Sequence, residues 1–250
     1  MTNESLRERA LQLRLHGLVE RWGEVEADPG LSRTVARLID WEEETRSESR
    51  RKRLLKSSRL RAFESLSTFD WVWPKRIRRD DIEELFSLAF LKERTDVVFL
   101  GPSGVGKTML AKNLVHEAAR RGEPAVFVEA AEMLGELVSE QSRTGVEKAL
   151  KRYAKPKLLA IDEVGYLSYD TRHADLLLRV VQSRHRQAST VVTTNRPFKE
   201  WREMFPNAAS VVALVDRLTE NCEVIQIEGD SYRTKRAQER KSRKESGRGK

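Results

Sequence analysis

The chain has 250 residues, of which 39% are hydrophobic and 34% charged, and its formal net charge is +8. This length suffices for a buried core, so the fold need not depend on metal ions or disulfides. The single cysteine, Cys222, excludes an intramolecular disulfide, and no cluster of Cys and His has the spacing of a zinc site. No segment approaches the roughly 20 apolar residues of a membrane helix, and the first residues do not resemble a signal peptide. We therefore predict a soluble, cytoplasmic protein.

Residues 1–66 are predicted to form a small helical domain. Apolar residues recur at helical spacing until Pro29-Gly30 interrupts the pattern, which predicts one amphipathic helix. A second helical stretch runs from near residue 31 to about residue 66, and its highly charged part is expected to project from a core. The periodicity breaks after residue 66, so we place a linker at about 67–76. The repeating positions of the first helix are Leu11, Leu15, Leu18 and Trp22.

Two dense basic runs flank the rest of the chain. Residues 46–61 hold eight Lys or Arg and one acid, and residues 231–250 hold nine basic residues against two Glu. Residues 234–250 have almost no apolar side chains to offset their ordering entropy by burial, so a disordered basic tail is predicted. Either run fits an ordinary solvated surface. Two such runs beside the nucleotide site described below favour a nucleic-acid partner.

From residue 75 onward, helix-like segments alternate with apolar runs of strand length. This alternation predicts an α/β fold with a parallel sheet covered by helices on both faces, and the core domain is assigned to residues 67–233. Ligands of such sheets bind beyond the carboxyl ends of the strands. The predicted strands are residues 97–100, 125–128, 158–162, 190–194 and 224–227.

The first predicted strand leads into a phosphate-binding loop. Residues 97–108 read VVFLGPSGVGKT, in which the pattern GxxxxGK[ST] lies between a strand-like and a helix-like run. Glycines let successive backbone N–H groups turn toward a phosphate, and the following helix offers its positive N-terminus. Lys107 is predicted to reach the β- and γ-phosphates, and Thr108 to ligate Mg²⁺. The predicted nucleotide contacts are Gly101, Pro102, Ser103, Gly104, Val105, Gly106, Lys107, Thr108 and Met109.

Polar residues close the next two strands of the predicted core. Residues 157–163 read KLLAIDE, and Asp162 lies 55 positions after Lys107. We expect Asp162 to hold Mg²⁺ through its water shell and Glu163 to polarise a water for attack on the γ-phosphate. Asn195, one strand over, is expected to hydrogen-bond that water and the γ-phosphate. Alone, the acids and the Asn-Arg-Pro segment also fit turns; together with the loop they predict a hydrolytic site.

These residues resemble a known family. Similarity to the IstB family of AAA+ ATPases, the transposition helper proteins of bacterial insertion sequences, is carried by GPSGVGKT, LLAIDEVGYL, VVTTNRPFKEW and VVALVDRLTENCEVIQIEGDSYR. The run from Glu48 to Phe63 is similar to the basic pattern of that family's N-terminal helical domain. The resemblance covers most of the chain and implies a five-stranded P-loop AAA+ core that uses ATP and Mg²⁺. DnaC-type replicative helicase loaders share this ATPase core.

The resemblance also implies roles for single residues. Asp162 and Glu163 match Walker B, and Asn195 matches the polar residue called sensor 1. Ser168 departs from the family because a proline commonly stands there, and Ser103 and Val105 replace other residues in the loop. The Walker A positions are Gly101, Gly104, Gly106, Lys107 and Thr108.

An arginine finger is implied as well. Arg217 matches the arginine that, in this clade, reaches the γ-phosphate of a neighbouring subunit, a contact worth roughly 10³ to 10⁵ in rate in other phosphoryl-transfer systems. Arg202 and Arg233 are rival candidates, and Arg217 also fits a helix-surface residue paired with Asp216 or Glu220. The chain turns into its basic tail directly after Arg233, which leaves no room for a helical lid. No second sensor arginine is therefore expected there.

The resemblance implies an ATP-dependent homo-oligomer on duplex DNA that recruits or stimulates a transposase. Lys and Arg contacts to phosphates would make DNA binding largely independent of sequence and strongly dependent on salt. Three alternatives stay open: a DnaC-type helicase loader, a nucleotide-gated adaptor that scarcely hydrolyses ATP, and a basic DNA-binding protein whose nucleotide site is defunct. The candidate DNA contacts are Arg50, Arg51, Lys52, Arg53, Lys56, Arg59, Arg143, Lys148, Lys151 and Arg152.

Overall fold

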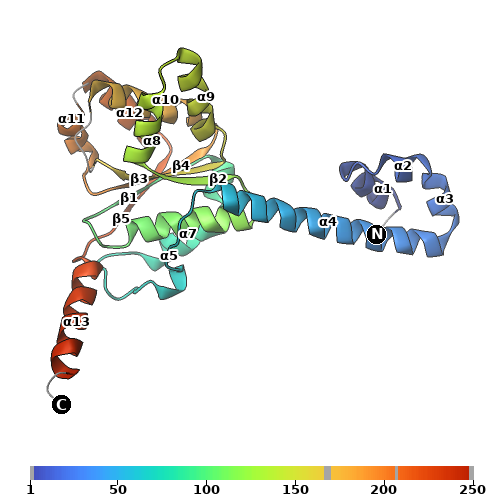
Figure 1. The fold of residues 1–250 in the computed structure, drawn as a ribbon, viewed down its shortest axis with the longest axis horizontal. Coiled ribbons are helices and arrows are strands. Elements are labelled where there is room, and N and C mark those ends of the chain that lie inside the picture. Colours follow the sequence, from blue (N-terminus) through green and yellow to red (C-terminus); the bar gives the residue numbers. More distant parts are fainter. Residues whose placement is uncertain (1–2, 166–169, 206–207, 248–250) are drawn as a thin grey trace. The chain divides into compact units, whose positions relative to one another are not determined.

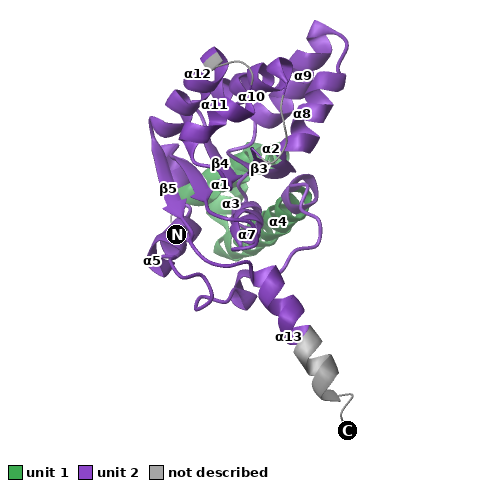
Figure 2. Cartoon of the chain, turned by 90° about the vertical axis from the view of Figure 1, so that its left-hand side faces the viewer, with its two compact units in different colours: residues 1–53 green, residues 54–250 purple. Residues whose placement is uncertain are grey.

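A computed structural model describes residues 3–165, 170–205 and 208–247, so Ser168 lies outside the described residues. Figure 2 shows two compact units, the N-terminal unit Met1–Arg53 and the core unit Leu54–Lys250. This division lies before the predicted boundary at residue 66. The residues between belong to the core unit: Ser58 is fully buried, and its carbonyl O accepts a hydrogen bond from Phe127 N at 2.9 Å.

From residue 3 onward, the N-terminal unit contains three short helices and the first part of a long one. The structure differs here from the single predicted helix, because the backbone turns at Arg14, which has a left-handed φ of 58°. Leu11 is 45% exposed, whereas Ile39 of the long helix is fully buried in the unit's core. Pro29 is the first residue of the long helix. At this position a backbone N–H would have no partner within the helix, so the N–H that proline lacks is not needed. The helices are α1 Asn3–Gln12, α2 His16–Glu20, α3 Trp22–Ala27 and α4 Pro29–Ser57.

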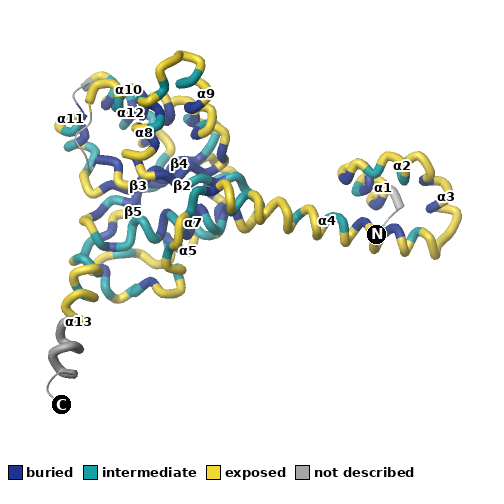
Figure 3. The backbone as a smooth tube through the Cα atoms, viewed as in Figure 1, coloured by how far each residue is buried: buried dark blue, intermediate teal, exposed yellow. Residues whose placement is uncertain are grey.

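The charged part of α4 has little buried surface. Residues 44–57 are exposed or half-buried, as Figure 3 shows by colour. Apolar side chains buried on α4 are Val35 and Ile39, both near its beginning. The sequence expectation that this segment lies outside a core agrees with this exposure.

The core unit is built on a five-stranded sheet in the order β2-β3-β4-β1-β5 (Figure 1). All four neighbouring pairs are parallel, so the carboxyl ends of the strands lie along one edge. This confirms the predicted α/β class. The strands are β1 Asp96–Leu100, β2 Ala125–Glu129, β3 Leu158–Val164, β4 Ser189–Thr194 and β5 Cys222–Gln226.

Helices cover both faces of this sheet, and each face has its own hydrophobic core (Figure 1). One core contains Ile82 of α5 and Leu114 of α7; the other contains Met133 of α8 and Leu214 of α12. In the described ranges, every helix is too short or too polar to cross a bilayer. The core unit's further helical segments are η1 Leu66–Thr68, α5 Arg79–Ser87, α6 Phe90–Glu93, α7 Lys107–Arg120, α8 Ala130–Ser139, α9 Arg143–Ala154, α10 Thr171–Arg184, η2 Phe198–Glu200, α11 Trp201–Met204, α12 Ala208–Thr219 and α13 Tyr232–Gly247.

Arg184, at the end of α10, is a buried cation that sequence reasoning did not single out. Only 1% of its surface is exposed, and burial lowers the pKa of its guanidinium to about 10. The guanidinium donates to the Thr190 hydroxyl and to several backbone carbonyls that precede β3 or begin β4, including Pro156 O at 2.8 Å. It therefore joins the amino ends of two central strands. The other acceptors are the carbonyl oxygens of Tyr153, Ala154 and Ser189.

The basic C-terminal segment is helical in the structure, which differs from the predicted disorder from residue 234. Its Lys, Arg, Gln, Glu and Ala residues have high helix propensity, so a helix can form there without much burial. The first turn of α13 is also anchored: Lys235 forms an ion pair with Asp70 at 3.1 Å. High charge does not prevent helix formation, because the helix propensity of these residues comes from their unbranched side chains and does not depend on burial.

Candidate nucleotide site

The phosphate-binding loop joins the carboxyl end of β1 to α7, as the sequence predicts. A Cβ on Gly101 would lie 2.1 Å from the carbonyl O of Ile227, so only glycine fits there. Gly106 has a left-handed φ of 102° and precedes the first residue of α7. No side chain caps this helix start. The N–H groups of its first turn are thus available to an anion, which the helix dipole also attracts.

Lys107 bends back over the loop that it follows. Its Nζ donates to the carbonyl oxygens of Gly101 at 2.7 Å and Pro102 at 2.8 Å. Burial is the main cause that lowers the pKa of this amine, and Asp162 and Glu163 oppose the shift. A phosphate would replace two neutral carbonyls with charged partners, which make stronger hydrogen bonds.

Asp162 lies at the centre of a hydroxyl network. Its carboxylate accepts hydrogen bonds from Thr108 Oγ1 at 3.1 Å and from Thr193 Oγ1 at 2.5 Å, and only 2% of the residue is exposed. Burial raises the pKa of this carboxyl, and the hydrogen bonds from the two hydroxyls and the charge of Lys112 offset the rise only in part. A hydroxyl beside a buried carboxylate fits Mg²⁺, which takes few protein ligands and completes its shell with phosphates and water.

Glu163 is aimed by an irregularity in β3. The register against β4 shifts between Ile161 and Val164, and Glu163 has a left-handed φ of 59°. Neighbouring residues of a regular strand point to opposite faces, but a bulge re-aims a side chain. Thr193 supports this geometry, since its hydroxyl accepts from Glu163 N at 2.9 Å while it donates to Asp162. The sequence signal for Thr193 was a polar residue after the two valines of β4, near the carboxyl end of the strand.

Three of the five catalytic candidates share a small cavity of about 70 Å³ at the carboxyl ends of β3 and β4. Lys107, Glu163 and Asn195 line it together with Ser103, Gly104, Thr193 and Arg233. Burial, followed by the charges of Asp162 and Glu129, raises the pKa of Glu163. A carboxylate with a raised pKa is a better proton acceptor near neutral pH. Sequence reasoning assigned neither Thr193 nor Arg233 to this cavity.

A larger cavity of about 260 Å³ adjoins the loop, and we call it the nucleotide cavity. Residues 104–109 line one side. The predicted linker forms another wall: Phe69 packs on Gly106, and Leu66 N donates to Asn113 Oδ1 of α7 at 2.9 Å. This segment is therefore part of the core unit rather than a free connection. The aromatic lining residues are Phe63, Phe69, Trp73 and Tyr232.

Of the three finger candidates, the structure brings only Arg233 to the phosphate loop, where it lines both cavities. Arg217 donates to the carbonyl O of Ala213 in its own helix at 3.0 Å and lines a separate cavity with Asp96, at the amino end of β1. Arg202 is exposed on α11 and lines a third cavity. Arg217 is thus remote from the site of its own chain.

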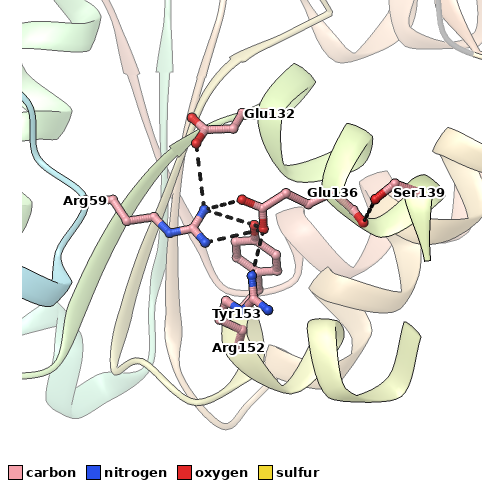
Figure 4. Close-up of polar contacts among 6 residues, drawn as sticks. All are labelled: Arg59, Glu132, Glu136, Ser139, Arg152 and Tyr153. Atoms are coloured by element: carbon pink, nitrogen blue, oxygen red, sulfur yellow. Dashed lines mark hydrogen bonds and ion pairs between the residues drawn. The ribbon is translucent and has the colours of Figure 1, made fainter. Parts of the chain in front are cut away.

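The predicted DNA contacts fall into separate groups. Arg59 is engaged inside the core unit: it pairs with Glu136 at 2.8 Å, and Tyr153 and Arg152 also hydrogen-bond Glu136 (Figure 4). Its guanidinium also lies over the Tyr153 ring. This cluster makes Arg59 a structural cation rather than a free phosphate contact. On α4, Lys52 pairs with Glu48 at 2.7 Å. The other candidates of α4 and α9 are exposed too: Arg50, Arg51, Arg53, Lys56, Arg143, Lys148, Lys151 and Arg152.

Three of the candidates on α9 lie together. Lys148, Lys151 and Arg152 line a cavity of about 600 Å³ beside β2, and we call it the basic cavity. Lys155, which sequence reasoning did not single out, also lines it. Four cations beside one edge strand form a surface that attracts polyanions.

Comparison with known proteins identifies relatives of most of the chain. Residues 8–240 match the family of IstB-like ATP binding proteins. The ATP-binding protein of insertion sequence IS5376 from Geobacillus stearothermophilus is 31% identical over 247 residues, which is 96% of this chain and 98% of that protein. The one of insertion sequence IS232 from Bacillus thuringiensis subsp. berliner is 34% identical over 202 residues, 81% of each chain.

Solved structures resemble the fold of a large part of the chain. The crystal structure of DnaI has a TM-score of 0.56 at 20% identity and covers 69% of this chain and 93% of that one. AMPPCP-bound DnaA from Aquifex aeolicus has a TM-score of 0.57 at 17% identity, and the match covers 69% of this chain and 52% of DnaA. These likenesses confirm the fold predicted for the core, a five-stranded parallel sheet covered by helices. With the match over residues 8–240 and the phosphate loop in place, this chain belongs to the family of IstB-like ATP-binding proteins.

Proposed function

We propose that this chain is an ATPase that helps an insertion sequence to transpose: with ATP it assembles on target duplex DNA and recruits or stimulates a transposase. The observation that carries the proposal is the convergence of the loop, Asp162, Glu163 and Asn195 on one edge of the sheet. Relatives named as ATP-binding proteins of insertion sequences supply the transposition context.

The proposed hydrolysis uses the groups at this edge. Lys107 and the first-turn N–H groups of α7 hold the β- and γ-phosphates, and Thr108 and Asp162 hold Mg²⁺. Mg²⁺, when bound, neutralises the charge on the phosphate oxygens. Glu163 accepts a proton from a water that attacks the γ-phosphorus, and ADP leaves with the former bridging oxygen. Asn195 orients that water by hydrogen bonding.

The aromatic wall of the nucleotide cavity is suited to a purine base. Phe63, Phe69, Trp73 and Tyr232 offer apolar faces next to the loop, and ring stacking on such faces does not require charge. Placing the base there leaves the triphosphate to run along the loop toward Glu163. This assignment gives the predicted linker a function in nucleotide binding.

Subunit assembly would complete the site. Arg217 is remote from the phosphate loop of its own chain, as a residue that serves a neighbour must be. We assign it as the trans arginine finger, so an isolated subunit would hydrolyse ATP slowly. The exposed cations of α4 and the basic cavity are assigned to DNA phosphates, with no base-specific contact.

Lys107→Ala tests the nucleotide assignment. Calorimetry with ATP and Mg²⁺ is expected to show tight binding to the wild type and at least a hundredfold weaker binding to the variant, because the loop loses its only side-chain cation. Light scattering with mixed-sequence duplex then tests assembly: a large species that needs both ATP and duplex supports the proposal. Unchanged ATP affinity in the variant would refute the nucleotide assignment. Assembly on single strands in preference to duplex would instead favour a helicase loader.

A further inference from the structure

Asn113 of α7 is a buried polar side chain whose hydrogen bonds reach the wall of the nucleotide cavity. Only 7% of the residue is exposed, and every other buried residue of this helix is Leu, Ala or Val. Its Nδ2 donates to the carbonyl O of Met109 at 2.8 Å and to that of Glu64 at 3.0 Å. Its Oδ1 accepts from Leu66 N at 2.9 Å. Asn is a weak helix former, so its place in an apolar helix face points to these contacts with a distant segment.

The two contacts outside α7 fix the part of the chain that carries the aromatic wall. Phe63, whose ring lines the nucleotide cavity, lies directly before the first bonded residue. After Leu66, the short helix η1 carries the constraint forward, because Phe69 N donates to Leu66 O at 3.0 Å. The Phe69 ring in turn packs on Gly106 of the phosphate loop. The amide of Asn113 therefore sets how far both rings stand from the loop.

The two halves of a nucleotide depend on this segment to different degrees. The loop offers a triphosphate its backbone N–H groups and Lys107, none of which belongs to residues 63–69. A base is held by ring faces, and stacking requires the rings at a defined separation. Without the Asn113 amide, Leu66 N and the carbonyl O of Glu64 lose a buried partner, and the segment is expected to move toward water to recover one.

We propose that Asn113 is a positioning residue for the nucleotide base: through the backbone of residues 64 and 66 it holds Phe63 and Phe69 where the base stacks. The inference rests on the proposed function, because it deepens the assignment of the aromatic wall to the base. Asn113 itself does not touch the nucleotide in this assignment. Its effect is therefore confined to ligands that have a base.

The test compares ATP with inorganic tripolyphosphate, both with Mg²⁺, by calorimetry without DNA at a concentration where light scattering shows monomers. Asn113→Ala is expected to weaken ATP binding about tenfold, which corresponds to one or two stacking contacts, and tripolyphosphate binding less than about threefold. Asn113→Gln keeps an amide one methylene further out, so a smaller loss of the same kind is expected. Asn221→Ala is the matched control, because this amide also donates to two backbone carbonyls, those of Glu93 and Arg94, but does not line the nucleotide cavity. Both its affinities are expected to stay unchanged.

A second variant tests whether Asn113 acts through the wall. Phe63→Leu is expected to reproduce the loss that is selective for ATP. Adding Asn113→Ala to it is expected to weaken ATP binding less than the same change does in the wild type, because both substitutions then disturb one contact with the base. Losses that simply multiply would overturn the inference.

The remaining outcomes separate this inference from the proposed function. An unchanged ATP affinity in Asn113→Ala overturns the inference and leaves the nucleotide site in place. Equal losses for ATP and tripolyphosphate overturn it as well, because Asn113 then supports the loop rather than the wall. If the wild type binds neither ligand, the proposed function fails first. Should circular dichroism show that Asn113→Ala does not fold, Asn113→Gln decides between the same outcomes.

Discussion

The small cavity at the carboxyl ends of β3 and β4 and the basic cavity hold their charged groups in physically different ways. The first collects single groups from separate segments: a strained backbone aims Glu163 into it, and the neighbouring Asp162 is buried under two hydroxyls. The second places exposed cations of α9 and its end beside β2, where each is open to solvent and Arg152 is paired with Glu136. Position decides the strength of a buried contact, whereas exposed charges act mainly through their sum. Single substitutions are therefore expected to have large effects in the first cavity and small, cumulative effects in the second.

The largest expected effect is on turnover in Glu163→Gln. Removing the general base is expected to lower the rate of ATP hydrolysis by about 10² to 10⁴ while ATP affinity stays within a few fold of the wild type. Glu129→Gln is the matched control: Glu129 ends the neighbouring strand and pairs in register with Asp162. Phosphate-release kinetics measure both. If Glu163→Gln hydrolysed ATP at the wild-type rate and Glu129→Gln lost most of its activity, the general base would be Glu129 of β2 instead.

The pH dependence of ATP turnover also tests the assignment of Glu163 as the general base. Because burial raises the pKa of Glu163, its base form is lost as pH falls through a window above the usual value for Glu, and turnover falls with it. Glu129 contributes to this shift by repulsion, so Glu129→Gln is expected to move the inflection to lower pH. An inflection that stays in place would show that Glu163 is not the group that titrates.

The next largest expected effect is on the free energy of unfolding. It concerns Arg184, a buried cation that lines neither cavity. Arg184→Met leaves several backbone carbonyls without their donor and is expected to lower the free energy of unfolding by about 3 kcal/mol. Arg179→Met, on the exposed side of the same helix, loses only a surface pair with Glu147 and is expected to cost less than about 1 kcal/mol. Urea unfolding measures both. Equal losses would mean that the buried hydrogen bonds of Arg184 stabilise the fold no more than the surface ion pair of Arg179 does.

The smallest effect per residue is expected in the basic cavity. Lys148→Ala, Lys151→Ala and Lys155→Ala, combined in one variant, are expected to reduce the salt dependence of duplex binding by about 0.9 per lost phosphate contact on a log–log plot. The control variant removes the same charge from the N-terminal unit through Arg7→Ala, Arg21→Ala and Arg33→Ala. Fluorescence anisotropy across a salt series gives both slopes. Equal slopes would show that net charge alone attracts DNA and that this cavity has no special role.

The sequence predicts the nucleotide site better than the proposed DNA contacts, for a physical reason. The loop and the carboxylates are recognisable because phosphate chemistry demands glycines, a lysine and acids at set spacings on strand ends, and parallel strands bring those ends together. The DNA contacts were less predictable, because a surface cation looks the same in sequence whether it faces water or a carboxylate. Arg59 shows this: its basic neighbours favour a DNA contact, but folding places Glu136 and Tyr153 beside it.

Local pattern alone determined that this chain has a parallel sheet, a phosphate-binding loop and two acids at a strand end. Tertiary structure decided what those groups meet. The examples are the Thr193 hydroxyl between the Asp162 carboxylate and the Glu163 backbone N–H, the bulge that aims Glu163, the aromatic wall from the predicted linker and the return of Arg233 to the loop. All of them depend on segments far apart in sequence. Periodicity reports only which face of an element is apolar, whereas the partners of a polar side chain are chosen by the packing of the whole core unit.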